Sequence, residues 1–449
     1  MRYIAIGLVF VAVLGFAPGR ASAGEFTDVI DAADQRYNGD PFDLTLRVGY
    51  ERFYKQGDIR RESFRTTPHD WDYYGYVNVA EYKQVTHILN MELDIGLFHD
   101  ISLKARLPLI LKDQRELNGK SSFRWQDDFN GDGSPDALFS TDFTSPDRSG
   151  IDYLTVGLWW GILDQGRDDT KPNWTVYVEG RFSVGEEMSA ACKKSDVDCT
   201  DGWNSEGNAT TAGTDGGISR GVHEIAGGFR LSRRYGIAEP YFGLEALVGF
   251  SKGGANFFID RNSVGQLNTR PPAVGTLDVG LEFIPWEVPD KGRKLVIGVG
   301  TGGKYHSEGR EFTPLFDALG TSSYFNEQPY VDFDGDGEND HGEEDAAVEG
   351  NSWTGMTDVE NYATIFGKVF IALEPAKYVK FRVGSNFSHE TEHFITKTDQ
   401  CPSDQVLSDG SGCAVYNWGH RPELDKPGNR FRAEKTFIWD FFIDATAQF

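Results

Sequence analysis

Two short acidic segments have the oxygen-rich pattern that a divalent cation requires. Each places acidic or amide side chains at alternate positions around a glycine, Gly133 in one segment and Gly337 in the other. Ca²⁺ takes about six to eight oxygen ligands, and alternate carboxylates on a tight turn converge on one point. We therefore expect both segments to bind Ca²⁺; the alternative is a pair of solvated acidic turns. The expected ligands are Asp128, Asn130, Asp132 and Asp136 in the first segment, and Asp332, Asp334, Asp336, Asp340, Glu343 and the backbone carbonyl of Glu338 in the second.

Both segments resemble the calcium loops of EF-hands and of thrombospondin-type repeats. They read D-x-N-x-D-G-x-x-D and D-x-D-x-D-G-x-x-D. Glu343 stands where an EF-hand has its bidentate glutamate, whereas the first segment has Phe139 there. Neither segment has flanking amphipathic helices, and Pro135 and Asn339 replace the usual apolar residue of the loop. The resemblance implies calcium as a cofactor of long loops, not EF-hand domains.

Four cysteines form two close pairs in the sequence, Cys192 with Cys199 and Cys401 with Cys413. In an exported chain, close pairs in even number predict two small disulfide loops. The alternative is four free thiols or a shared metal site, although the spacing is not that of a zinc ribbon.

A hydrolytic site has weak support in the sequence. His389, Glu390, Glu392 and His393 cluster near the end of an expected strand, but without a zinc-protease spacing. No Gly-x-Ser-x-Gly motif occurs. We therefore predict no enzyme activity, while a surface lipase with Ser and His on adjoining strands stays open.

The first residues have the pattern of a secretory signal peptide. Arg2 is followed by an apolar stretch over residues 4–16 and by the small-residue sequence Ala21-Ser22-Ala23. This pattern predicts a signal peptide over residues 1–23, with Gly24 as the mature N-terminus; the alternative is a buried N-terminal helix. Residues 24–41 are expected to form a short periplasmic segment.

Segments of alternating apolar and polar residues recur along the remaining chain. In one of them the apolar set is Leu89, Met91, Leu93, Ile95 and Leu97. About twelve such segments fit, an even number that allows an antiparallel barrel to close. The expected fold is all-β: one transmembrane up-and-down β-barrel over residues 42–449 with short periplasmic turns. Long outer loops are expected near residues 55–81, 112–150, 186–220, 251–272, 306–358 and 390–430.

The last residues resemble the C-terminal strand of bacterial outer-membrane β-barrel proteins. Phe449 ends an apolar stripe formed by Ala447, Ala445, Ile443, Phe441 and Trp439. In such proteins the barrel-insertion machinery reads this aromatic end. The resemblance implies a chain embedded in the lipid of the bacterial outer membrane. A soluble β-sandwich is the alternative, but every apolar face would then need a protein partner.

Strand parity assigns the polar faces to the barrel lumen. Their charges would either create a transverse field that orients a solute or form ion pairs that fill a narrow interior. Aromatic residues near strand ends, Trp159 and Tyr241 among them, are expected in girdles at the membrane interfaces. The residues expected to line the lumen are Arg47, Glu51, Glu92, Asp94, Lys104, Arg106, Glu179, Arg181, Lys380, Arg382, Asp440 and Asp444.

The net charge of −25, from 69 acidic and 44 basic residues, argues against nucleic acid as a partner. We expect a monomeric barrel that acts as a narrow passive channel for a small polar solute. The first alternative is a non-conducting surface protein whose calcium-braced, disulfide-pinned loops serve binding or adhesion. An outer-membrane enzyme and the sheath of an electron conduit are further alternatives, and the chain has no haem-attachment motif.

The calcium hypothesis predicts that Asp336→Ala makes its loop more sensitive to protease. Without a cation the clustered carboxylates repel one another, whereas bound Ca²⁺ orders them at an affinity of roughly 10⁻⁴ to 10⁻³ M. Limited proteolysis with calcium and with chelator measures the effect, and barrel stability should not change. Equal cleavage under both conditions, with no calcium heat in titration calorimetry, would reduce the segment to an acidic turn.

Overall fold

The computed structural model describes residues 24–27, 43–67, 70–98, 100–120, 138–191, 202–203, 209–210, 217–252, 267–322, 325, 354–401, 417 and 419–449. Both expected calcium segments, the expected signal peptide and three of the four cysteines lie outside these residues. Cys401 is disulfide-bonded, and the pairing of the four cysteines stays a prediction. Among the described residues, no helix has the length and apolar character needed to cross a membrane.

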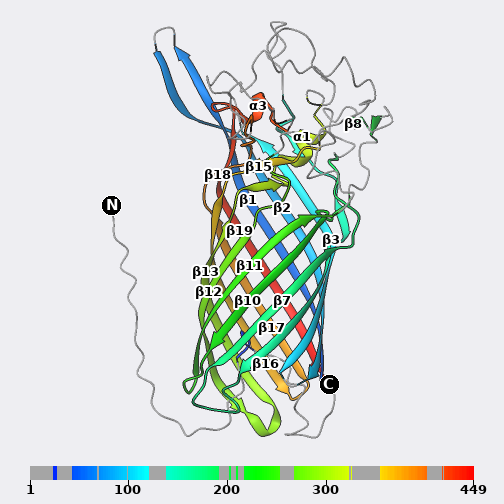
Figure 1. Ribbon diagram of the computed structural model, residues 1–449, viewed down its shortest axis with the longest axis vertical. Coiled ribbons are helices and arrows are strands. Elements are labelled where there is room, and N and C mark those ends of the chain that lie inside the picture. The colour runs from blue at the N-terminus through cyan, green and yellow to red at the C-terminus, as the bar shows by residue number, and fades with distance from the viewer. Residues whose placement is uncertain are drawn as a thin grey trace.

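Twelve antiparallel strands form one closed barrel (Figure 1). Each strand pairs with its neighbours in the chain, and β1 pairs with β19 to close the ring. The expected all-β fold and the strand number are confirmed. The strands are β1 (Leu44–Thr67), β2 (Asp70–Phe98), β3 (Ile101–Gly119), β6 (Tyr153–Leu163), β7 (Asn173–Ser183), β10 (Val222–Ser232), β11 (Ala238–Ser251), β12 (Val274–Val288), β13 (Arg293–His306), β16 (Tyr362–Ala376), β17 (Val379–Glu390) and β19 (Phe431–Gln448).

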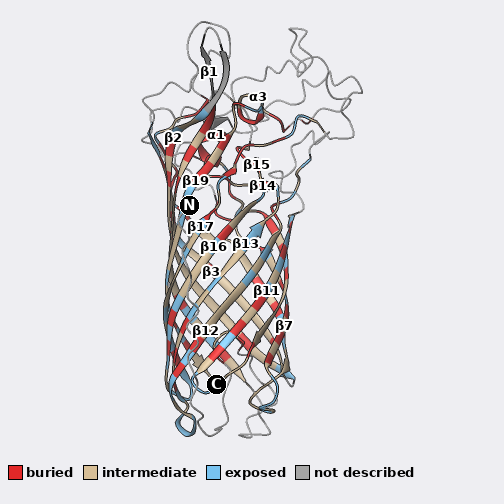
Figure 2. Ribbon diagram, turned by 90° about the vertical axis from the view of Figure 1, so that its left-hand side faces the viewer, coloured by how far each residue is buried: buried red, intermediate tan, exposed pale blue. Residues whose placement is uncertain are grey.

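The outer face of the barrel is apolar because of the two-residue period of its strands. On β6, Leu158 and Trp160 are half exposed, whereas Trp159 between them is 5% exposed. On β19, Ile443 is half exposed and the adjacent Asp444 is buried. Figure 2 shows the same alternation of exposed and buried positions along the strands. Since apolar side chains cover the outside without a protein partner, the surrounding medium has to be lipid.

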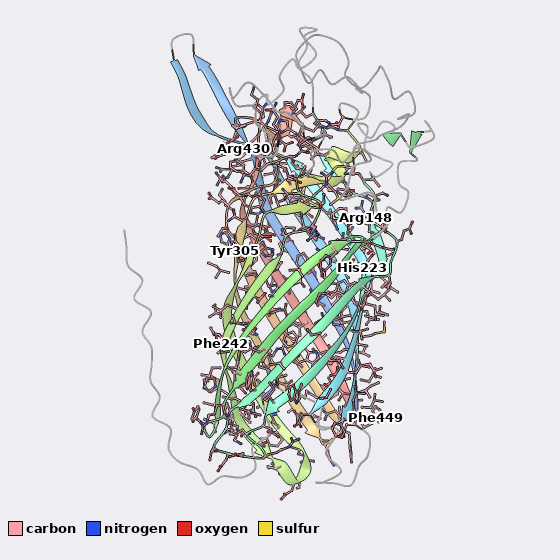
Figure 3. All side chains as sticks on the ribbon, viewed as in Figure 1. Arg148, His223, Phe242, Tyr305, Arg430 and Phe449 are labelled. Atoms are coloured by element: carbon pink, nitrogen blue, oxygen red, sulfur yellow. The ribbon has the colours of Figure 1, made fainter. Side chains whose placement is uncertain are left out.

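Phe449 ends the chain at the seam between the first and last strands (Figure 3). Its backbone N–H donates to the carbonyl of Leu44 at 2.8 Å, and its own carbonyl accepts from the N–H of Leu44 at 3.2 Å. Its side chain is largely exposed. Reading of this residue by the insertion machinery stays a proposal.

The two ends of the barrel have very different connections. Short turns, one of them the helix η2 (Pro289–Lys291), lie at the end where the C-terminus is found (Figure 1). At the other end, β1 and β2 extend beyond the barrel as a hairpin. The whole strands have 24 and 29 residues. The segment 55–81, expected to be an outer loop, is therefore mostly strand. The alternation continues there because Ile59, Val79 and Tyr82 have buried apolar contacts outside the lipid.

A folded cap covers the barrel end opposite the short turns. A buried apolar cluster in the cap includes Leu315, Leu319 and Leu424 together with inward residues of β1–β3. The segments expected as loops near 112–150, 306–358 and 390–430 therefore contain packed structure. The additional elements at this end are β4 (Phe143–Thr144), β5 (Arg148–Ile151), β8 (Gly202–Trp203), β9 (Ala209–Thr210), β14 (Gly309–Glu311), α1 (Phe316–Gly320), β15 (Thr357–Val359), β18 (His393–Phe394) and α3 (Pro422–Asp425).

A buried ion pair ties the cap to the barrel wall. The guanidinium of Arg148, labelled in Figure 3, donates to both carboxylate oxygens of Asp317 at 2.5 and 2.9 Å. Asp317 also accepts hydrogen bonds from Ser145 Oγ at 2.7 Å and from the N–H of Ala191 at 3.1 Å. The pair thus joins β5, α1 and the segment after β7, with both side chains almost fully buried.

Arg148→Met should loosen the cap without opening the barrel. The substitution leaves Asp317 buried and unpaired, which costs on the order of 3–5 kcal/mol. Arg148→Met with Asp317→Leu removes both charges and should restore most of the loss. Limited proteolysis reports on the cap, and migration of the unboiled protein in a detergent gel reports on the barrel. Wild-type protease resistance in the single variant would contradict a stabilising role for the pair.

Candidate functional site

A polar cavity of about 290 Å³ lies in the lumen toward the end with the short turns. Asp444 lies just outside the cavity and pairs with two residues that line it, Arg382 at 3.0 Å and Arg47 at 3.9 Å. Glu51 and Asp440 do not line it; Glu51 accepts a hydrogen bond from Asn90 at 2.9 Å. The structure brings together nine of the residues expected in the lumen: Arg47, Glu92, Asp94, Lys104, Arg106, Glu179, Arg181, Lys380 and Arg382.

Charged side chains on neighbouring strands form several ion pairs in the lumen. These pairs neutralise opposite charges across short distances. This arrangement favours the ion-pair interpretation over the transverse field. The pairs are Arg47–Glu92 at 3.1 Å, Lys104–Asp94 at 3.2 Å, Arg181–Glu224 at 3.5 Å and Arg382–Asp444 at 3.0 Å.

The cavity wall still carries more cations than anions. Seven basic and five acidic side chains line it, and Glu224 and Asp444, which pair with Arg181 and Arg382, lie just outside it. Nε of Arg106 is buried without a hydrogen-bond partner among the described residues. The surface that faces the cavity is therefore more basic than acidic, although the carboxylates around it balance its total charge. The basic residues are Arg47, Lys104, Arg106, Arg181, Arg230, Lys380 and Arg382, and the acidic ones are Glu25, Glu92, Asp94, Glu179 and Glu245.

Residues 24–27, at the expected mature N-terminus, lie inside the barrel beside this cavity. Glu25 pairs with Lys380 of β17 at 2.9 Å, and both side chains are almost fully buried. The hydroxyl of Thr27 bonds Ser232 Oγ at 2.7 Å, and its carbonyl accepts from Thr175 Oγ1 at 3.1 Å. The sequence predicts a periplasmic segment over residues 24–41, but these four residues occupy the lumen because the wall offers them charge and hydrogen-bond partners.

Aromatic rings and a guanidinium hold the N-terminal segment in place. Phe26 stacks on Tyr241 with ring centroids 4.1 Å apart. The guanidinium of Arg230 lies 5.0 Å from the ring of Phe26 and 4.6 Å from that of Trp159. Trp159 in turn stacks on Tyr177 at 4.1 Å. Trp159 and Tyr241 are therefore lumen residues, not girdle residues. Because successive residues of a strand face opposite sides, an outward Trp160 already predicts an inward Trp159.

Three further cavities continue from the first toward the cap. Their volumes are about 310, 220 and 230 Å³. The first and second share Arg230, the second and third share Arg220, and the third and fourth share Lys55 and Glu311. These shared walls place the cavities in one row along the lumen.

Of the two histidines considered for hydrolysis, His393 is packed at the rim of the barrel and His389 is exposed. The ring of His393 lies 4.0 Å from the ring of Tyr362, on which His306 also stacks at 4.2 Å. Glu390 pairs with Lys55 at 2.9 Å. Among the described residues, no group of three or more His, Cys, Asp or Glu side chains could hold a metal ion. The structure gives His393 a stacking role at the fourth cavity.

No family model and no curated protein matches the chain. Similar solved structures include an outer membrane channel from Pseudomonas putida F1, with 9% identity, 92% of this chain and 98% of that chain covered, and a TM-score of 0.39. A Pseudomonas aeruginosa FadL homologue has 10% identity, 90% coverage of each chain and a TM-score of 0.33. The outer membrane protease OmpT from Escherichia coli has 8% identity, 91% and 98% coverage and a TM-score of 0.26. Similarities this weak assign neither family nor activity.

The class of the protein follows from its own barrel. A closed ring of twelve strands with an apolar exterior and a charged lumen is the structure of a bacterial outer-membrane β-barrel protein. Within that class, this barrel has a folded cap at one end and its own residues 24–27 in the lumen near the other.

Phe26→Ala should free the N-terminal segment from the lumen. The change removes a half-buried aromatic ring that contributes up to about 1.5–3 kcal/mol, together with its contacts to Tyr241 and Arg230. Aminopeptidase trimming of the folded mature protein, followed by mass spectrometry, measures the release. Phe387→Ala, which removes a ring from the outer face, is the control. Equal trimming of the two variants would contradict a holding role for Phe26.

Proposed function

We propose that this protein is a narrow passive channel for small polar solutes, with a preference for anions. The observation that carries the proposal is the row of cavities from Glu25 to Glu390, lined mainly by polar and charged side chains. A barrel with a purely structural role needs no such row, because side chains can fill a lumen of this width. A transport path needs polar walls and room for a hydrated solute.

The charge of the first cavity supports the preference for anions. The basic groups that face it lie in surroundings that screen them less than bulk water does. Guanidinium groups bind planar carboxylates and tetrahedral phosphates through paired N–H donors. Arg106 offers such donors with no described acid at ion-pair distance. Small carboxylates and phosphate therefore fit the wall better than amines do.

Conduction requires one end of the row to move. The cap is held by its apolar cluster and by the Arg148–Asp317 pair. Near the short turns, the described residues that occupy the lumen are only the four residues 24–27. We therefore assign the opening motion to residues 24–27 and a static role to the cap.

The second candidate is a non-conducting surface protein used for binding or adhesion. The packed cap favours it, because a passive channel needs no apolar cluster above its mouth. In this candidate, calcium at the two acidic segments and the predicted disulfides brace the outer surface. Neither candidate includes a catalytic step.

Ion selectivity in a planar bilayer tests the channel. Arg106→Gln should lower the chloride-to-potassium permeability ratio by a factor of about 2–5, as expected for the loss of one charge worth roughly 0.5–1 kcal/mol at high effective dielectric. The reversal potential in a potassium chloride gradient measures this ratio. Lys171→Gln makes the same charge change in an exposed turn and should leave the ratio unchanged.

Two outcomes would count against the channel. One is an equal permeability ratio in Arg106→Gln and Lys171→Gln, which would remove the anion preference. The other is an absence of conductance steps both in the wild type and in a variant lacking residues 24–27. That second result would favour the surface protein.

A further inference from the structure

Two buried glutamates face each other across neighbouring strands near the short turns. Glu239 of β11 and Glu282 of β12 are directly opposite in register, and each is 1% exposed. Like charges directly opposite each other destabilise a sheet, and a buried carboxylate is unfavourable without a cation or donors. This glutamate pair therefore needs a partner.

Hydrogen bonds satisfy only one of the four oxygens of the glutamate pair. Oε1 of Glu239 accepts from Ser232 Oγ at 2.5 Å and from Asn173 Nδ2 at 3.3 Å. Oε2 of Glu239 and both oxygens of Glu282 are buried without a hydrogen bond of good geometry among the described residues, while the backbone N–H of Glu25 lies near the Glu282 carboxylate. Buried acceptors of this kind are rare in folded proteins. Three of them side by side indicate a site for a cationic donor.

The lysines at this end of the lumen have other acidic partners. Lys380 pairs with Glu25 at 2.9 Å and with Glu374 at 3.5 Å, and Lys294 lies 3.9 Å from Glu374. Lys294 also attracts Glu282, so these two lysines serve four glutamates. The glutamates Glu25, Glu239, Glu282 and Glu374 therefore leave an excess of two negative charges at this end of the lumen.

Gly24 lies directly against the glutamate pair. A methyl group added to its Cα would collide with the carboxylate of Glu282 and lie 3.0 Å from Oε2 of Glu239. Its nitrogen is about 1.5 Å from that Cα, and so lies within reach of the same carboxylates. Predicted cleavage after Ala23 would turn this nitrogen into a terminal ammonium.

We propose that the glutamate pair is the binding site for the α-ammonium of the processed chain. An ammonium brings three N–H donors to three unsatisfied oxygens and places a positive charge between two negative ones. An amide nitrogen brings one donor and no charge, so the site is complete only after the leader is removed. Leader removal thereby anchors residues 24–27 in the lumen, which is the closed state of the proposed channel. The inference concerns this anchored state and holds whether or not the barrel conducts.

Acetylation of the mature protein, folded in detergent, with an N-hydroxysuccinimide ester tests the site. Trypsin releases residues 24–36, which contain no lysine, so an acetyl group on this peptide reports the α-amine alone. The folded wild type should react at least tenfold more slowly than the heat-denatured protein. Glu239→Gln with Glu282→Gln keeps the side-chain shape but removes both charges, and should react at least tenfold faster than the folded wild type.

Glu51→Gln is the matched control, because Glu51 is a carboxylate that accepts a hydrogen bond from Asn90 at 2.9 Å and does not line the first cavity. It should keep the wild-type rate. If the double variant does not fold, each single Gln variant should give an intermediate rate. A mature N-terminus other than Gly24, equal rates in folded and denatured wild type, or wild-type protection in the Gln variants would overturn the proposal.

Discussion

Every backbone N–H and C=O of a strand in hydrocarbon needs a partner, because lipid offers no hydrogen bonds. This requirement makes β1 pair with β19, since an open edge would leave a row of unsatisfied groups in the membrane. Closure in turn fixes which face of each strand points inward. Leu158 and Trp160 can then face lipid only if Trp159 between them faces the lumen. The charged interior is thus a consequence of the closed ring.

A charged interior imposes a constraint of its own, because buried ions are unfavourable without partners. The chain meets it largely by placing opposite charges on neighbouring strands, as in the Arg47–Glu92 and Lys104–Asp94 pairs. Residues 24–27 take part in the same balance through the pair between Glu25 and Lys380. The N-terminal segment is therefore electrostatically part of the barrel wall, although it belongs to no strand.

The strands could be predicted from the sequence because their period of two residues is local information. Strand parity also places Arg47, Arg106 and Arg382 on the face that lines the first cavity. It could not identify Glu25 and Phe26, because a segment outside the strands has no periodicity and its partners lie hundreds of residues away. The strand extensions at Ile59 and Val79 were mistaken for loops, since their apolar partners in the cap are equally remote in sequence. For Trp159 the alternation of residues along its strand indicates an inward position, although its aromatic side chain is also typical of a girdle residue.

The seam between β1 and β19 also determines how the chain can reach its native state. Thr45 and Gln448 are register partners about 400 residues apart, so their contact closes one of the longest loops that the chain can form. Contacts of such long range form slowly, and a sheet that lacks its last strand exposes two unpaired edges until then. Assembly must therefore be protected until the final strand arrives. Synthesis order, which delivers β19 last, makes the finished ring an all-or-none product of the complete chain.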